Sequence, residues 1–149
     1  MFINDFNEIV LQSKNSVIAI GAVIIIVGII AVLAVEIYVR QKLKCRYFHF
    51  GKIKLSPTLL MCIPLIIAMI TIGIQINKYN LDIANASYET YIGYCTYKSE
   101  SVRLQEKKLS IYVGKGHMRV PHGTNYGKCI YSKRSKVIVY WEPLEVPQE

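Results

Sequence analysis

Two long and almost unbroken apolar runs constrain this chain more than any other feature. Residues 17–39 are almost entirely Val, Ile, Ala, Leu and Gly, and residues 56–76 contain no charged side chain. At about 1.5 Å per residue, a helix of either length covers a hydrocarbon core of roughly 30 Å. A soluble chain of 149 residues is too short to bury two such helices in its own core. The sequence therefore predicts a hairpin of two transmembrane helices.

A cleaved signal peptide is the alternative for the first run. The preceding residues 1–16 carry Asp5, Glu8 and Lys14, so this segment is not positively charged as a signal peptide requires. The apolar run is also longer than the core of about 7–15 residues found in signal peptides. We therefore predict an uncleaved anchor, preceded by an N-terminal tail at residues 1–16.

The segment between the runs predicts the orientation in the membrane. It carries six positive charges and no negative one, namely Arg40, Lys42, Lys44, Arg46, Lys52 and Lys54. Because short loops rich in Lys and Arg stay in the cytoplasm, residues 40–55 are predicted to be a cytoplasmic loop, with both termini outside. The predicted location is the cell membrane, as a multi-pass protein. Long C-terminal domains cross membranes regardless of their own charge, which keeps the inverted topology open as an alternative.

Within the spans, three features suggest local structure. Pro64 removes a backbone hydrogen bond in the second run, which predicts a helix kink. Glu36 lies four residues before Arg40, a spacing that favours an ion pair at the membrane interface. Gly21 and Gly28 share one helix face, which favours close packing of the two helices or of two copies of the chain.

The remainder of the chain has the pattern of a small β domain. Its runs of aromatic and β-branched residues are short, and turn-forming residues separate them. We expect a linker at 77–87, in which residues 80–86 could briefly continue the second helix. Strands are expected at 88–98, 109–113, 117–120, 129–131 and 136–141, with 102–104 as a strand or a loop, 121–127 as a loop and 132–135 as a hairpin connection. The predicted fold class is an α+β membrane protein, in which the hairpin precedes an extracytoplasmic antiparallel domain at 88–149. An OB-like or SH3-like barrel fits a domain this small, because closure removes exposed sheet edges.

The four cysteines divide between two environments. Cys45 lies in the basic loop and Cys62 in the second run, whereas Cys95 and Cys129 lie in predicted strands of the exported domain. Disulfides persist outside the cytoplasm, so Cys95 and Cys129 are a candidate disulfide. In the chain-entropy model, such a bridge stabilises the fold by about 3–4 kcal/mol. The alternative is two separate buried thiols.

No motif in the sequence indicates catalysis. Nucleophile elbows, zinc-protease helices and phosphate loops are absent from the sequence. His117, His122 and Cys129 match no established zinc spacing. We therefore predict no catalytic, metal or cofactor site, and a protein that is not an enzyme.

The last predicted hairpin suggests an interaction surface instead. Over residues 77–149, eleven Lys and Arg stand against seven Asp and Glu, in a chain of net charge +8. Basic and aromatic side chains alternate near the hairpin: Tyr126, Lys128, Tyr131, Lys133, Arg134, Lys136, Tyr140 and Trp141. Outside the cytoplasm such a surface suits anionic lipid headgroups or an acidic wall polymer, whereas single-stranded nucleic acid fits only the inverted topology. The alternative is that these residues form a solvent-exposed hairpin tip that binds no ligand.

These observations favour a non-catalytic binding domain held at the outer face of the membrane. A membrane-held immunity protein is one version, by analogy alone. An accessory subunit of a transporter or secretion complex, packed against a larger membrane protein, is a second. A membrane-tethered nucleic-acid-binding barrel is the third and follows only if the topology is inverted. The sequence leaves homo-oligomerisation open.

Overall fold

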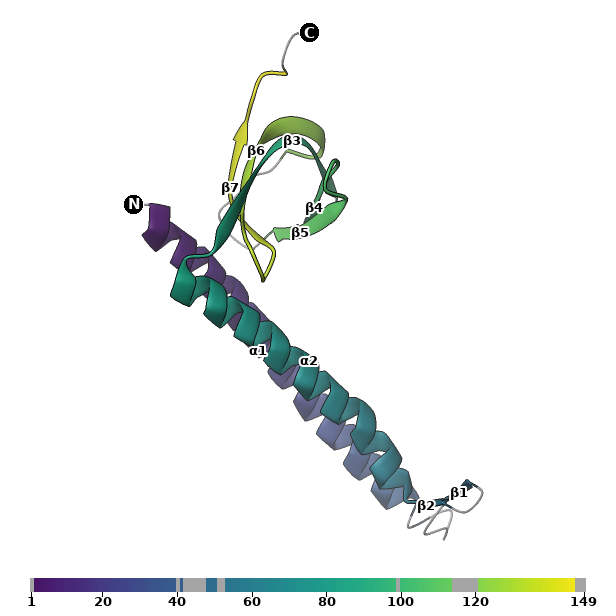
Figure 1. The fold of residues 1–149 in the computed structure, drawn as a ribbon. Coiled ribbons are helices and arrows are strands. Elements are labelled where there is room, and N and C mark those ends of the chain that lie inside the picture. Colours follow the sequence, from purple (N-terminus) through teal and green to yellow (C-terminus); the bar gives the residue numbers. More distant parts are fainter. Residues whose placement is uncertain are drawn as a thin grey trace. The chain divides into compact units, whose positions relative to one another are not determined.

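The computed structural model describes residues 2–39, 41, 48–50, 53–98, 100–113 and 121–146. Two helices, α1 (Phe2–Tyr38) and α2 (Pro57–Asn85), flank the short antiparallel strands β1 (Phe48–Phe50) and β2 (Ile53–Leu55) (Figure 1). Five strands follow: β3 (Tyr88–Lys98), β4 (Ser101–Leu104), β5 (Leu109–Val113), β6 (Gly123–Ser132) and β7 (Val137–Pro143). The chain divides into two compact units, one formed by Val17–Ile74 and the other by Met1–Ser16 together with Gln75–Glu149.

Both helices are long and apolar enough to cross a membrane, judged by length and composition. In the most apolar 18-residue window of each, only 6% of α1 and 0% of α2 is buried. A core helix of a soluble protein would be mostly buried, so these apolar windows are not covered by the protein itself. The part of the prediction that concerns two long apolar helices is confirmed.

Within the unit Val17–Ile74, small residues of α1 face apolar side chains of α2. A Cβ atom added to Gly21 would lie 3.0 Å from Ile72, and one added to Gly28 would lie 2.5 Å from Leu65. These glycines therefore let the two helices of this unit approach closely, as their shared face predicted. Near the other end of the hairpin, the Thr58 hydroxyl donates a hydrogen bond to the Glu36 carboxylate. Arg40, the predicted partner of Glu36, lies outside the described residues.

An apolar groove of about 220 Å³ lies between the same two helices, with Gly28, Ala31, Pro64 and Ala68 among its lining residues. Pro64 lies inside α2, which continues on both sides of it. The kink at Pro64 stays a prediction.

Both helices extend beyond the predicted spans, and the second extends in the direction that the sequence allowed for residues 80–86. Residues 2–16 form the first turns of α1, and residues 77–85 continue α2. Phe6, Val10 and Ser13 are buried at the spacing of one helix face. The Phe6 ring lies 6.2 Å from the ring of Tyr88 at the start of β3. The first turns of α1 bury this face within the same compact unit as the sheet.

The five strands after the helices form one closed sheet in the order β3-β4-β5-β7-β6. Closure comes from the antiparallel pairing of β3 with β6, which runs from Tyr88 opposite Ser132 to Tyr97 opposite Gly123. The pair β5–β7 is parallel, so the sheet is mixed and the prediction of a purely antiparallel domain is wrong. The reason is geometric: neighbours in a ring with an odd number of strands cannot all run in opposite directions.

The observed bounds of β3 and β5 are those that the sequence predicts, because local composition determines both strands. Strand β6 is longer than predicted, because its first half, which the sequence suggested was a loop, pairs with Gly93–Tyr97 of β3. The predicted strand at 117–120 lies outside the described part of the chain. Inward-facing side chains of the sheet form one core: Tyr91, Cys95, Val102, Leu104, Ile111, Val113, Cys129, Tyr131, Ile138 and Trp141.

The candidate disulfide is absent, because Cys95 and Cys129 are both free and buried. Cys95 is opposite Asn125 and Cys129 is opposite Tyr91, an offset of four positions along the paired strands. That offset is about 13 Å at the rise of a β-strand, whereas a disulfide needs Cα atoms within about 7 Å. Burial raises the pKa of the Cys95 thiol to about 11 and that of Cys129 to about 12.

This arrangement predicts that neither thiol reacts while the sheet is folded. Iodoacetamide at pH 8 should leave Cys95 and Cys129 unmodified in the folded protein, because both thiols are buried and protonated. Both should be alkylated once denaturant is added, as measured by peptide mass spectrometry. Recovery of a Cys95–Cys129 cross-linked peptide from unreduced protein would contradict the register described here.

Candidate interaction surface

The aromatic residues of the predicted surface divide between the two faces of the sheet. Successive residues of a strand point to opposite faces, so the alternation in β6 separates Tyr126 and Lys128 from Tyr131. Tyr131 and Trp141 belong to the core, while Tyr140 is exposed on β7. Tyr131 and Trp141, which the sequence suggested as part of the interaction surface, therefore lie in the interior instead.

The outer face of β3, β6 and β7 carries an apolar and aromatic patch, which we call the outer patch and define as Ile92, Tyr94, Tyr126, Ile130 and Tyr140. Ile92, Tyr94 and Tyr140 are 52%, 41% and 39% exposed. The rings of Tyr94 and Tyr126 meet edge to face with centroids 5.1 Å apart. Lys128 borders the outer patch, opposite Ile92 on one side and Glu142 on the other.

Sequence reasoning missed Ile92 and Tyr94 as surface residues. The alternation of β3 places them on one face, but the sequence does not show which face is buried. Only the pairing of Ile92 with Lys128 and of Tyr94 with Tyr126 brings these side chains beside the predicted ones.

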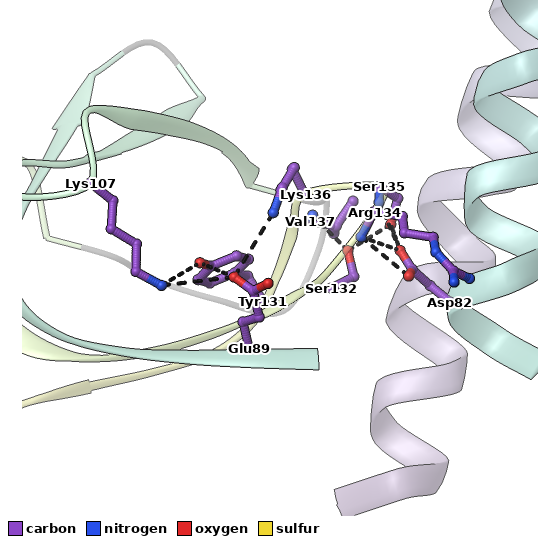
Figure 2. Close-up of polar contacts among 9 residues, drawn as sticks. All are labelled: Asp82, Glu89, Lys107, Tyr131, Ser132, Arg134, Ser135, Lys136 and Val137. Carbon is purple, nitrogen blue, oxygen red and sulfur yellow. Dashed lines mark hydrogen bonds and ion pairs between the residues drawn. The ribbon is translucent and has the colours of Figure 1, made fainter. Parts of the chain in front are cut away.

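The basic residues of the hairpin lie in the β6–β7 turn, which we define as residues 133–136. This turn is bound by Asp82 of α2 (Figure 2). The carboxylate accepts hydrogen bonds from the backbone N–H of Arg134 at 3.1 Å and of Ser135 at 2.7 Å, and from the Ser135 hydroxyl at 2.8 Å. Asp82 is completely buried, so these donors replace the water that its charge would otherwise require.

Every backbone N–H from Lys133 to Val137 has an acceptor. Lys133 donates to the Ser87 carbonyl at 2.9 Å, and Lys136 donates to the Ser132 carbonyl at 3.2 Å. Val137 donates to the Ser132 hydroxyl at 2.9 Å, and that hydroxyl lies 2.6 Å from the hydroxyl of Ser135. The turn is therefore held by its backbone, which leaves the Lys133 and Arg134 side chains exposed.

A second polar cluster surrounds the phenol of Tyr131. Its hydroxyl donates to the Glu89 carboxylate at 2.6 Å and accepts a hydrogen bond from Lys107 at 3.2 Å. Lys136 lies 4.0 Å from the same carboxylate and stands over the Tyr131 ring (Figure 2). The Tyr131 hydrogen bond, with help from Lys136 and Lys107, lowers the pKa of Glu89, whereas burial and Glu89 raise the pKa of Tyr131. This cluster pairs Lys136 with Glu89, whereas Lys133 acts on Glu89 only through its field.

Across the described ranges, no group of three His, Cys, Asp or Glu side chains is arranged to hold a metal ion. His122 lies against the ring of Tyr97, with centroids 4.9 Å apart, and His117 lies outside those ranges. Arg40, Lys42, Lys44, Arg46 and Lys52 of the predicted topology determinants also lie outside them, as does the side chain of Lys54, whose backbone belongs to β2.

The architecture that results is a pair of long apolar helices followed by a closed five-stranded mixed sheet. No protein-family model matches the sequence, and neither curated proteins nor solved structures show significant similarity to it.

The Asp82 contacts predict a specific loss of stability. Asp82→Asn removes the charge and turns an amide group towards backbone donors, so the free energy of unfolding of the sheet should fall by about 1.5–3 kcal/mol. Fluorescence of Trp141, the only tryptophan in the chain, measures this unfolding. Glu145→Gln, which changes an exposed carboxylate, is the matched control. Equal stability of Asp82→Asn and the control would contradict the structural role of Asp82.

The Glu89–Tyr131 hydrogen bond predicts a pH dependence. Because the pKa of Glu89 is lower in the folded protein than its ordinary value of 4.5, its stabilising contribution is present above about pH 4.5 and is lost as the pH falls through the folded pKa. Tyr131→Phe should cost about 1–2 kcal/mol at pH 7 and less below pH 4. The control Tyr140→Phe removes an exposed hydroxyl and should change little. A deficit of Tyr131→Phe that does not vary with pH would contradict this assignment.

Proposed function

We propose that this protein is an integral membrane protein that presents its β-rich domain outside the cytoplasm as a non-catalytic binding module. The observation that carries the proposal is the charge distribution around the apolar helices. Six basic residues lie in the 15-residue segment 40–54, against Lys14 alone in the N-terminal 16 residues and Lys78 alone in residues 77–92. This asymmetry favours a cytoplasmic loop and external termini.

The helix contacts support the predicted span boundaries. Gly21 lies four residues inside the predicted start of the first span, and its neighbour Ile72 lies four residues inside the predicted end of the second. The predicted start of the first span and the predicted end of the second span are therefore equally far along their helices from the Gly21–Ile72 contact. Two spans that enter the bilayer together require such a match.

We further propose that the domain is an OB-like barrel. Its first strand pairs with its fourth, and its third pairs in parallel with its fifth, which gives the order of a five-stranded Greek-key barrel. An SH3-like barrel has less support from this order. OB-like barrels host many binding functions, so the likeness by itself indicates no ligand.

One observation favours a second candidate function, a membrane-tethered module that binds single-stranded nucleic acid. The outer patch combines three exposed or half-buried tyrosines with Lys128, a combination on which bases stack. This candidate requires the domain to lie in the cytoplasm, where nucleic acid is present.

The test is the side of the membrane on which the C-terminal domain lies. A cysteine introduced at the exposed Thr124 should react with a membrane-impermeant maleimide on intact cells, while one at Gln41 should react only after permeabilisation. Cys45 and Cys62 replaced by Ser give a clean background, since Cys95 and Cys129 are buried. The reverse pattern would overturn the external placement and favour the nucleic-acid candidate.

A further inference from the structure

The basic turn between β6 and β7 is bound by a residue that lies close along the chain to the predicted membrane boundary. Asp82, which binds the turn, comes six residues after Ile76, the last residue of the predicted second span. These six residues are helical, so Asp82 lies about 9 Å beyond the hydrocarbon core when the helix stands upright. The headgroup layer on each side of a bilayer is about 5–8 Å thick. If α2 spans a bilayer up to Ile76, the turn that Asp82 binds would therefore lie near the outer edge of the headgroups.

The side chains of the turn fit the charge of that layer. Lys133 and Arg134 are exposed, and neither forms an ion pair with any acidic side chain that the structure describes. Asp82 is already satisfied by hydrogen-bond donors of the turn, and Glu89 is engaged by Tyr131, Lys107 and Lys136. Long basic side chains extend towards a surface while their backbone stays fixed. Lys133 contributes to the field that lowers the pKa of Glu89, but neither Lys133 nor Arg134 is held in an ion pair that the structure describes, so both side chains are available to external anions.

From this geometry we infer that Lys133 and Arg134 bind anionic lipid headgroups of the membrane in which the protein sits, with Asp82 fixing their distance from it. The inference rests on the proposed function, because it requires α2 to span a bilayer up to about Ile76. The preferred ligand is a phospholipid with net negative charge, such as phosphatidylglycerol, over zwitterionic phosphatidylcholine. Each Lys or Arg within a Debye length of a negative surface gains attraction that salt weakens.

The experiment measures the thermal unfolding of the sheet by Trp141 fluorescence in the full-length protein. Nanodiscs contain either phosphatidylcholine alone or phosphatidylcholine with phosphatidylglycerol at about 30 mol%, a strongly anionic surface. Because anionic lipid binds the folded turn, its presence should raise the midpoint of wild type by about 4–8 °C. Salt at 0.5 M, where the Debye length falls to about 4 Å, should remove most of this shift.

Matched variants assign the effect to the turn. The double variant Lys133→Gln/Arg134→Gln should lose most of the shift, whereas Lys98→Gln/Arg103→Gln should keep it. The control removes the same charge from two exposed residues, Lys98 at the far end of β3 and Arg103 on the neighbouring strand β4. Both variants retain the basic segment 40–54, so any effect of that segment is common to them.

Three outcomes would overturn the inference: no shift in wild type, the same shift in both double variants, or a shift with soluble polyglutamate in neutral nanodiscs but none with phosphatidylglycerol. The last would identify an acidic polymer as the ligand. Co-elution of the protein with nanodiscs is recorded in the same experiment. Failure to enter nanodiscs would overturn the proposed function, while insertion without lipid dependence would overturn only the lipid contact.

Discussion

The buried carboxylate of Asp82 is the interaction on which the arrangement of the sheet-containing unit depends. A charge without water in a protein interior is unfavourable by several kcal/mol unless donors surround it. Here the donors are backbone N–H groups of one turn and the hydroxyl of Ser135. The turn must therefore take one conformation and lie at one place on α2. The hydrogen bond from Lys133 to the Ser87 carbonyl fixes the same turn from the start of β3.

Closure of the sheet determines what the rest of that unit offers to a partner. Pairing of β3 with β6 directs Tyr91, Cys129 and Tyr131 into the core and leaves Tyr94 and Tyr126 outside. The register of the same pair separates the two buried cysteines by four positions, so they pack in the core without a covalent bridge. A tyrosine-rich sequence thus supplies both the core of a small domain and an exposed aromatic face. The basic turn at the α2 end is a separate feature, held by polar contacts.

These two surfaces give the proposed binding module two different roles. In the proposed membrane topology, Lys133 and Arg134 would lie close to the end of the second apolar run, with the membrane surface as the nearest source of anions. The outer patch is apolar and aromatic, and its chemistry suits a macromolecular ligand. Membrane attachment and ligand binding would then use different parts of one domain, and the contact of the turn with lipid would limit how the outer patch is oriented.

The sequence alone determined the features that depend on long runs of residues of one kind. Two apolar helices, the basic segment between them and the strands at β3 and β5 follow from composition and period, because these act locally along the chain. The helical turns at residues 2–16 were missed, although Phe6, Val10 and Ser13 have helical spacing, because short amphipathic turns become stable only by packing. The long β6, the parallel pair β5–β7 and the unbridged cysteines depend on strand register. Strand register is decided by contacts between distant segments, which only the tertiary structure brings together. The same holds for the hydrogen bonds of Asp82 with Arg134 and Ser135, which are 52 and 53 positions later in the chain.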